Sequence, residues 1–165
     1  MSTTTAAAIR DRMIAVISAL VPSSLSSDAF IEYPNEATGN FRVWANANPG
    51  AAWRSFQVRT ILDPTAYHAV EVSNTDLEEN YGTFVVTVSY PQDSRAGDGG
   101  ALRRDDVIDQ DRKMIEKAIG LDGAANFTPD TGADATYRGH LPTVEAGDTC
   151  DFLVIRQTMS FTLAV

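Results

Sequence analysis

Apolar residues change their spacing between residues 82 and 120. Over about residues 82–90 they recur at every second position, which predicts a half-buried strand. The polar, glycine-rich run after Pro91 is typical of a loop. Apolar residues then return at helical spacing and predict a helix over about residues 104–120 that should cover the strand. The apolar sides of these two elements are Phe84, Val86, Val88, Tyr90, Val107, Ile108, Met114, Ile115, Ala118 and Ile119.

The two ends of the chain carry the next clearest patterns. After several hydroxyl residues that can cap a helix, helical spacing predicts a helix over about residues 4–21, which Pro22 ends. At the other end, one parity of apolar residues predicts a strand over about residues 150–165, with Gln157 as the polar member of the inward series. The apolar positions are Ile9, Met13, Val16, Ile17 and Leu20 in the helix, and Leu153, Ile155, Met159, Phe161, Leu163 and Val165 in the strand.

Residues 40–62 show two short strand patterns on either side of a turn signal. Asn48-Pro49-Gly50-Ala51 has proline second and glycine third, as a type II turn requires. We therefore predict a hairpin over about residues 40–62, with strands at Phe41–Ala45 and Trp53–Leu62. Residues 67–73 and 137–144 are weaker strand candidates, and residues 121–141 are expected to form an exposed excursion.

These elements predict one domain over residues 1–165 with an α+β fold. The expected architecture is a two-layer sandwich in which two helices pack on one face of a mostly antiparallel, four- to five-stranded sheet. Trp44, Trp53 and Val85 fall on the other face. They predict either an apolar outer surface that a partner covers or ordinary packing under loops.

Composition and charge narrow the function classes. With 44% hydrophobic and 21% charged residues the chain has ordinary globular composition. Its net charge of −9 argues against binding nucleic acid, because few cations are offered to the phosphates. The single cysteine, Cys150, excludes an internal disulfide framework and a thiolate zinc site. Charged residues at 10–12 interrupt the first apolar stretch, so we expect no signal peptide or membrane span, and a soluble intracellular protein or particle component.

Asp130-Thr131-Gly132-Ala133 resembles the string around the catalytic aspartate of retroviral-type aspartic proteases. In those enzymes two such aspartates share a proton and activate a water. Their motif follows a hydrophobic strand, whereas here it follows Asn126-Phe127-Thr128-Pro129. An aspartic protease is therefore an alternative that the string alone supports.

The remaining polar clusters favour structural roles. Four aspartates near the start of the second predicted helix suggest a cation site, yet acidic side chains also complement a helix dipole, and the calcium-loop pattern fails here. They are Asp105, Asp106, Asp109 and Asp111. His68 and His140 lack a paired ligand spacing. We therefore predict no cofactor, no metal and no catalytic residue.

Three arginines lie on or beside the glycine-rich loop, namely Arg95, Arg103 and Arg104. The last two precede a helix start, where the helix dipole disfavours a cation. They are therefore either available to carboxylates of a neighbouring subunit or paired locally with aspartates.

The order of elements along most of the chain resembles that of a known family. The matching parts are the Ile9-Arg10-Asp11-Arg12-Met13-Ile14 helix, the Phe41-Arg42-Val43 strand, the Val85-Val86-Thr87-Val88-Ser89-Tyr90 strand with its arginine-containing loop, the Asp105–Ile119 helix and the C-terminal strand. This pattern is similar to that of the tail terminator proteins of tailed bacteriophages, small α/β subunits at the head–tail joint.

The resemblance implies a virion protein that assembles in the host cytoplasm into a homo-oligomeric ring, usually a hexamer. Such a ring lies between the last ring of tail tube protein and the head-side connector or stopper, and it ends tube polymerisation. DNA passes through it without specific binding, which the negative charge suits. A head-completion or stopper protein of the same neck is the close alternative, and a stand-alone ligand-binding domain is another.

Two groups of residues are the expected sites of such a ring. Subunit or ring contacts are predicted at Trp44, Trp53, Arg95, Arg103 and Arg104. Acidic residues lining the DNA channel are predicted among Asp76, Glu78, Glu79, Asp122, Asp130 and Asp134.

Overall fold

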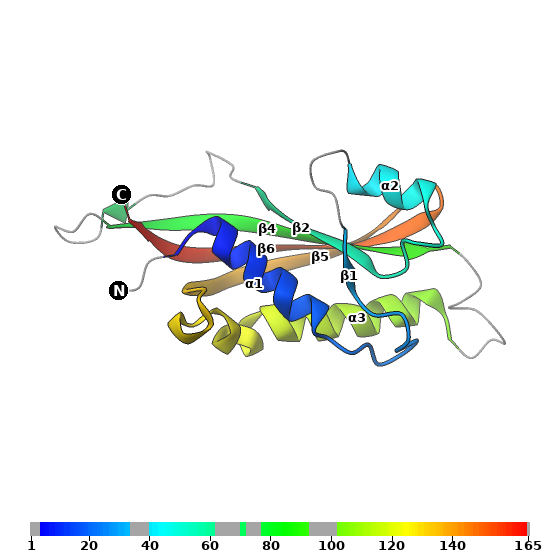
Figure 1. The fold of residues 1–165 in the computed structure, drawn as a ribbon, viewed down its shortest axis with the longest axis horizontal. Coiled ribbons are helices and arrows are strands. Elements are labelled where there is room, and N and C mark those ends of the chain that lie inside the picture. Colours follow the sequence, from blue (N-terminus) through cyan, green and yellow to red (C-terminus); the bar gives the residue numbers. More distant parts are fainter. Residues whose placement is uncertain (1–3, 34–39, 62–69, 72–76, 93–101, 165) are drawn as a thin grey trace.

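A six-stranded sheet runs the length of the molecule, and helices lie on both of its faces (Figure 1). The computed structural model describes residues 4–33, 40–61, 70–71, 77–92 and 102–164, and at 70–71, 77–80 and 163–164 it describes the backbone alone. The strands are β1 (Ile31–Glu32), β2 (Ser55–Ile61), β3 (Val70–Glu71), β4 (Leu77–Pro91), β5 (Ala135–Ala146) and β6 (Cys150–Ala164). Their order is β1-β2-β4-β6-β5, with β3 also paired to β4.

The pairing is antiparallel except between β1 and β2. This confirms the α+β class with a mostly antiparallel sheet. The central strands β4 and β6 have 15 residues each and pair along their whole length, from Leu77 opposite Ala164 to Pro91 opposite Cys150. The strands predicted at 82–90 and 150–165 therefore exist, and the first of them begins earlier, at Leu77.

Both predicted helices are present and lie on the same face of the sheet (Figure 1). Helix α1 (Ala6–Ser18) begins after Thr5, whose hydroxyl accepts a hydrogen bond from the Ala8 amide at 3.1 Å. Helix α3 (Arg104–Ile119) has acidic residues in its first turn and a lysine in its last, an arrangement that the helix dipole favours.

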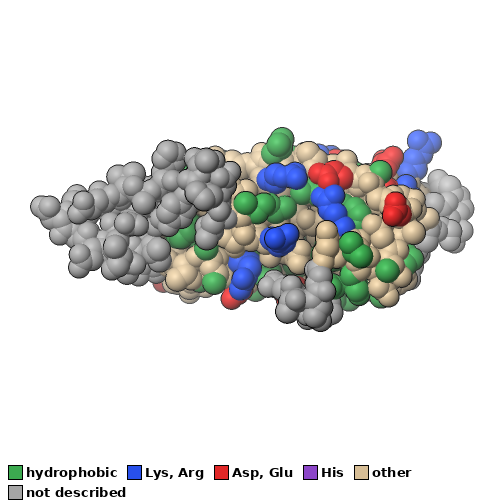
Figure 2. Space-filling view, turned by 90° about the horizontal axis from the view of Figure 1, so that it is seen from above, with side chains coloured by type: hydrophobic (Ala, Val, Ile, Leu, Met, Phe, Trp, Pro, Cys, Tyr) green, Lys and Arg blue, Asp and Glu red, His purple; other side chains and the backbone are tan. Residues whose placement is uncertain are grey.

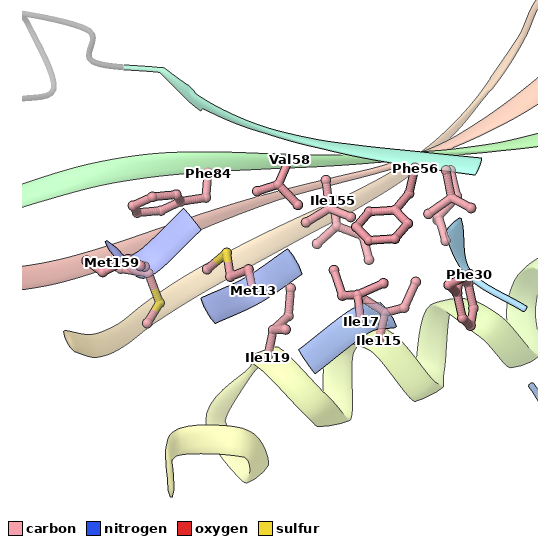
Figure 3. Close-up of a cluster of buried hydrophobic side chains, with 14 of the residues drawn as sticks. Met13, Ile17, Phe30, Phe56, Val58, Phe84, Ile115, Ile119, Ile155 and Met159 are labelled. Carbon is pink, nitrogen blue, oxygen red and sulfur yellow. The ribbon is translucent and has the colours of Figure 1, made fainter. Parts of the chain in front are cut away.

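The main hydrophobic core fills the space between these two helices and the sheet. The inward residues of β4 (Phe84, Val86, Val88 and Tyr90) are fully buried, as their alternation predicts. Figure 3 shows side chains of α1 and α3 pointing toward the sheet, among them Met13, Ile17, Ile115 and Ile119. Burying each large apolar side chain stabilises the fold by about 1.5–3 kcal/mol, so this layer is what holds the helices in place.

Gln157 is fully buried in the same core, on the inward side of β6. Its amide Nε2 donates a hydrogen bond to the carbonyl of Ile119 at 2.5 Å. Because that carbonyl belongs to the last turn of α3, where no helical partner is available, the side chain ties the end of α3 to β6.

Residues 41–47 form a helix, α2 (Phe41–Ala47), and the predicted hairpin over 40–62 is therefore wrong. Asn40 caps the helix, since its side-chain oxygen accepts a hydrogen bond from the Arg42 amide at 3.0 Å. Phe41 and Ala45 lie one helical turn apart and are both buried. Five residues are too few for periodicity to separate a strand from a helix, and here the packing of Phe41 decides the outcome.

Strand β2 therefore has a different neighbour from the one expected. It pairs antiparallel with β4, with Val58 opposite Val86, and β1 adds to its other edge at Ser55 and Phe56. Its predicted inward residues Phe56 and Val58 are buried in the main core.

Helix α2 lies on the face opposite α1 and α3, over the end of the sheet where β6 begins (Figure 1). It encloses a second, smaller apolar cluster made of Tyr33, Phe41, Ala45, Ala52, Cys150, Phe152 and Val154, with Trp44 and Val85 packed against it. The expected two helices on one face are thus joined by a third helix on the other, which the sequence pattern did not predict.

The two tryptophans do not share an outer surface, contrary to the expectation. Trp53 is only 4% exposed and belongs to the main core, where its ring packs edge-on against Tyr90 with centroids 5.9 Å apart. Trp44 lies half-buried on α2, with its ring 4.8 Å from that of Tyr33.

The exposed excursion expected over residues 121–141 is only partly present. It contains two short 3-10 helices, η3 (Leu121–Phe127) and η4 (Pro129–Thr131), and Phe127 and Ala133 are buried in the main core. Residues from 135 onward belong to β5, so the weaker strand candidate at 137–144 is confirmed. Of the candidate at 67–73, Val70 and Glu71 form β3, and the other residues lie outside the described ones.

Candidate functional site

The second face of the sheet carries exposed and half-buried side chains beyond the area that α2 covers. Figure 2 looks onto this side of the molecule and shows basic side chains set among hydrophobic ones. We define the open face by five of these residues, Arg59, Ile61, Val85, Leu141 and Arg156, together with Arg42 of α2. Two of its aliphatic residues are strongly exposed, Ile61 by 46% and Leu141 by 60%.

Strand register places four of these residues in one row across the sheet. Arg59 of β2 is opposite Val85 of β4, Val85 is opposite Arg156 of β6, and Arg156 is opposite Leu141 of β5. Side chains directly opposite on neighbouring strands are in contact range. Basic and apolar side chains therefore alternate along the row. Such a row offers a partner protein both apolar contacts and ion pairs.

Two of the arginines share one carboxylate. Arg42 forms an ion pair with Glu145 at 2.5 Å, and Arg156 approaches the same carboxylate at 3.7 Å. Hydrogen bonding by the Arg42 guanidinium lowers the pKa of Glu145, so the carboxylate is charged at neutral pH. Arg42 also lies over the ring of Phe152, at 5.2 Å from its centroid. Among the described residues, two cations here share one anion, which leaves a positive excess.

Arg59 is exposed and forms no ion pair with any described residue. It borders a groove of about 500 Å³ that runs along β2 beside the first turn of α2. The groove is lined by Arg10, Asn40, Phe41, Gln57, Val58, Arg59 and Thr60. A guanidinium without a local acceptor can pair with a carboxylate in two parallel hydrogen bonds.

A surface of opposite charge lies on the other side of the sheet, beyond the end of α3 (Figure 1). We call residues 121–134 the acidic segment, because they contain three aspartates and no lysine or arginine. Asp122 and Asp130 are exposed, and Asp134 is half-buried. Leu121, next to Asp122, is 71% exposed.

A buried ion pair between Arg54 and Asp111 is the polar feature that sequence reasoning missed. The two side chains are fully buried, and the Arg54 Nε and Nη2 donate to the Asp111 carboxylate at 2.6 and 3.1 Å. The remaining Arg54 donors reach the backbone carbonyls of residues 24, 25 and 28, at 2.6 to 3.0 Å. All five N–H groups of a guanidinium are thereby used, so Arg54 has none left for a ligand.

Tyr90 completes this cluster, because its hydroxyl donates to Asp111 at 2.8 Å. Burial, followed by the negative charge of Asp111, raises the pKa of Tyr90 well above its usual value. Burial also raises the pKa of Asp111, while the Arg54 guanidinium acts in the opposite direction. The cluster joins α3, β4 and the loop before β1, and its role is to fix their positions.

The sequence contains a signal for this pair. Arg54 has the same parity as Phe56 and Val58, the inward residues of β2. Asp111 lies on the apolar stripe of α3, between Ile108 and Ile115. Two opposite charges that both fall on core-facing positions predict a buried ion pair.

The Asp130-Thr131-Gly132 string lies in a turn. Asp130 and Thr131 belong to η4, and Gly132 follows with a φ of 78° that favours glycine. The Thr131 hydroxyl lies 2.8 Å from the carbonyls of Asn126 and Thr128, and Asp130 is exposed. The string thus lacks the hydrophobic strand that carries the motif in retroviral-type proteases.

The aspartates of α3 have separate environments. Asp105 and Asp106 are exposed in the first turn, whereas Asp109 pairs with Arg112 at 2.7 Å and with Lys113 at 2.8 Å. Within the described parts of the chain, no three acidic, histidine or cysteine side chains are grouped so that they could hold a metal ion. His140 lies 2.5 Å from the Tyr137 hydroxyl, and His68 is outside the described residues.

The structure separates the residues predicted for subunit contacts. Arg104 pairs with Asp151 of β6 at 2.6 Å, a partner in the same chain but distant in sequence, whereas Arg103 is exposed at the start of α3. Arg95 lies outside the described residues. Trp53 is buried in the core, and Trp44 packs within the second cluster.

The residues predicted for a DNA channel fall into two groups. Glu78 and Glu79 belong to β4, where Glu78 is opposite Glu71 of β3, and Asp76 lies outside the described residues. The other three are the aspartates of the acidic segment, at the far end of α3.

Comparison with known proteins adds no family to this description, since no protein-family model and no curated protein matches the chain. Among the described residues, no helix has both the length and the apolar character needed to cross a bilayer.

Proposed function

We propose that this chain is a structural subunit of the neck of a tailed bacteriophage. In this proposal copies of the chain form a ring, six in number as in the tail terminators, that ends the tail tube and joins it to the head-side connector. The order of elements supports it, with one departure. The Phe41-Arg42-Val43 segment, which enters the resemblance as a strand, is part of helix α2.

The observation that carries the proposal is the open face. Exposed aliphatic side chains such as Ile61 and Leu141 mark a surface that another protein covers. The arginines between them give the contact orientation and select a partner of opposite charge. A chain with a net charge of −9 that gathers arginines around an apolar row is suited to binding an acidic protein surface.

We place the DNA channel at the acidic end of the sheet. Glu71 and Glu78 occupy facing positions on β3 and β4, and Glu79 follows. Negative charge along a channel repels phosphates and lets DNA slide, because no counterions are released by contact. Glu78→Lys with Glu79→Lys should leave ring assembly intact and slow DNA ejection from the particle. Ejection at the wild-type rate would argue against this placement.

The first test is the assembly state of the purified protein. Native mass spectrometry and negative-stain images should show a closed ring with a central channel, alone or on added tail tube protein, because some rings form only on their partner. A chain that stays monomeric with its tube protein present would contradict the proposal.

The second test separates the terminator from the stopper. Particles that lack the protein should carry overlong tails if it ends tube polymerisation. Filled heads that leak DNA beside separate tails of normal length would instead identify a stopper. Normal particles in its absence would exclude both.

A further inference from the structure

We propose that the open face of one copy binds the acidic segment of the next copy, an inference that rests on the ring of the proposed function. The two surfaces are unlike in charge and lie on opposite sides of the sheet (Figure 1). One molecule cannot bring them together, so the contact is between copies and runs head to tail. Contacts of this kind close into a ring when the rotation between copies is right.

The charge of the open face requires an acidic occupant. Among the described residues of this face, Arg42 and Arg156 share Glu145, and Arg59 has no ion-pair partner. An occupant that brings two or more carboxylates therefore gains charge-assisted hydrogen bonds.

The apolar part of the face favours protein over nucleic acid. The row presents the aliphatic side chain of Val85 between its two arginines and that of Leu141 beside Arg156. Single-stranded nucleic acids instead bind surfaces on which aromatic rings stack with bases. The negative charge of the whole chain also opposes a polyanion, whereas a short acidic segment with an apolar residue fits.

The acidic segment has the matching chemistry. Asp122 and Asp130 supply exposed carboxylates, and Leu121 supplies an exposed aliphatic side chain beside them. With no lysine or arginine within the segment, its carboxylates are not neutralised by neighbours in sequence. The acidic segment thus combines carboxylates with an apolar side chain, whereas the open face combines guanidinium groups with apolar side chains. The two surfaces are therefore complementary in charge and both partly apolar.

The segment is also held rigidly, which lowers the entropy cost of binding. Phe127 anchors it in the main core. The side-chain amide of Asn126 donates to the carbonyl of Ala118 at 2.8 Å, and the Arg12 side chain of α1 donates to the backbone carbonyl of Asn126 at 3.0 Å. These bonds fix η3 against both helices before any partner arrives.

Reciprocal charge reversal tests the contact. Arg59→Glu with Arg156→Glu on one surface, and Asp122→Arg with Asp130→Arg on the other, should each weaken self-association at least about tenfold in sedimentation experiments. The variant that carries all four changes should regain most of the lost association, because the charges are then complementary again. Failure of the four changes to restore it would overturn the inference.

Matched controls carry the same change in net charge at exposed positions elsewhere. Lys113→Glu with Lys117→Glu, and Asp11→Lys with Asp148→Lys, should leave association within about twofold of the wild type, since exposed charges and exposed ion pairs such as Lys113–Asp109 contribute little. Circular dichroism identifies any variant that is not folded. If Arg59→Glu is not folded, Arg59→Gln takes its place, because Arg59 is exposed and has no ion pair among the described residues, and it should still weaken association.

The outcomes distinguish this inference from the proposed function. Rings that form normally in all charge-reversed variants would leave the neck function in place and rule out this contact. A wild type that never self-associates, even on tube protein, would overturn both. Retention of duplex or single-stranded DNA by the wild type at physiological salt, lost in Arg59→Glu, would show that the face binds nucleic acid and would overturn the inference alone.

Discussion

Arg54 and Arg59 belong to the same stretch of chain around β2, yet their environments are opposite. Arg54 is fully buried, and each of its N–H groups has an acceptor from Asp111 or a backbone carbonyl. Arg59 is exposed beside a groove and has no ion pair among the described residues. Arg59 lies within β2, where strand alternation places it on the face opposite Phe56 and Val58, whereas Arg54 precedes the strand in a turn, with a φ of 50°, and its side chain enters the core.

The comparison separates an arginine that specifies the fold from one that is available for recognition. A buried ion pair loses its hydration, so its net contribution is small while both partners are present, yet removing one partner leaves an uncompensated charge. An exposed arginine contributes little to stability and keeps its donors for another molecule. Substitutions at the two places should therefore affect different measurements.

The largest effect is expected at Asp111. Asp111→Ala leaves the buried Arg54 guanidinium without its carboxylate, and we expect a loss of about 3–5 kcal/mol in the free energy of unfolding. Urea denaturation followed by circular dichroism measures it. Because small domains are stable by only about 5–15 kcal/mol, the variant should be close to unfolding at 37 °C.

Asp109→Ala is the matched control on the same helix. Asp109 pairs with Arg112 and Lys113 at the solvent-exposed surface, so its removal should produce a far smaller change. Equal losses from Asp109→Ala and Asp111→Ala would show that burial of the pair does not matter, and the distinction between the two arginine sites would fail.

Tyr90→Phe should have an intermediate effect of about 1.5 kcal/mol, because it removes one hydrogen bond to a charged group in the core. It also predicts a pH dependence. The folded-state pKa of Tyr90 lies above its ordinary value of 10.0, so the neutral phenol is favoured by folding. Its contribution is complete below about pH 10.0 and is lost as the pH rises through the raised pKa.

Thermal melting at increasing pH measures this contribution. The wild type should lose stability above pH 10.0, and Tyr90→Phe should lose less over the same range. Tyr137→Phe, at a half-buried ring whose hydroxyl lies beside His140, is the control and should retain the wild-type profile. Identical alkaline profiles for the wild type and Tyr90→Phe would place the titration elsewhere.

Long periodic patterns predict the main layer of this fold. The inward residues of β4 and β6 and the apolar stripes of α1 and α3 could all be identified, because a period of two or of 3.6 repeats several times in each element. Helix α2 could not be identified, since its seven residues complete only two turns and begin with Phe41 on a strand-like pattern. There tertiary packing on Phe152, with ring centroids 6.3 Å apart, overrides local preference.

The candidate site was less predictable than the fold, because it depends on strand order. Arg59, Arg156 and Leu141 lie on three different strands. Only the order and register of four strands place them in one row across the sheet. The sequence alone directed attention to Trp53 and Arg104, which the structure places in the core and in an ion pair with Asp151. Whether a residue is available to a partner depends on its exposure in the folded chain, and residue type alone does not reveal that exposure.

Glu145→Gln sharpens the comparison on the open face, where two arginines share this carboxylate. Since the side chains of Arg42 and Glu145 are partly exposed and their charges are screened by solvent, the loss in stability should remain below about 1 kcal/mol. The folded-state pKa of Glu145 lies below its ordinary value of 4.5, so its contribution is present above pH 4.5 and is lost as the pH falls through the lowered pKa.

The same substitution should have the opposite effect on assembly. Removing the negative charge frees Arg42 and Arg156 for the carboxylates of a neighbouring copy, so self-association should become tighter while the monomer becomes slightly less stable. Sedimentation at several protein concentrations and urea denaturation of the same samples provide the two measurements. Weaker association of Glu145→Gln would mean that the carboxylate itself contacts the partner.

The smallest effect on stability is expected at Arg59. Arg59→Gln removes an exposed charge with no ion pair among the described residues, so the free energy of unfolding should change by less than about 0.5 kcal/mol. Its association should nevertheless weaken, because the groove beside β2 loses its guanidinium. Arg103→Gln is the matched control, since Arg103 is also exposed but lies at the start of α3, on the other side of the sheet. If Arg103→Gln alone weakens association, the subunit contact lies at the start of α3 and the open face is not the site. If only Arg59→Gln weakens it, the arginine that contributes least to folding is the one that assembly requires.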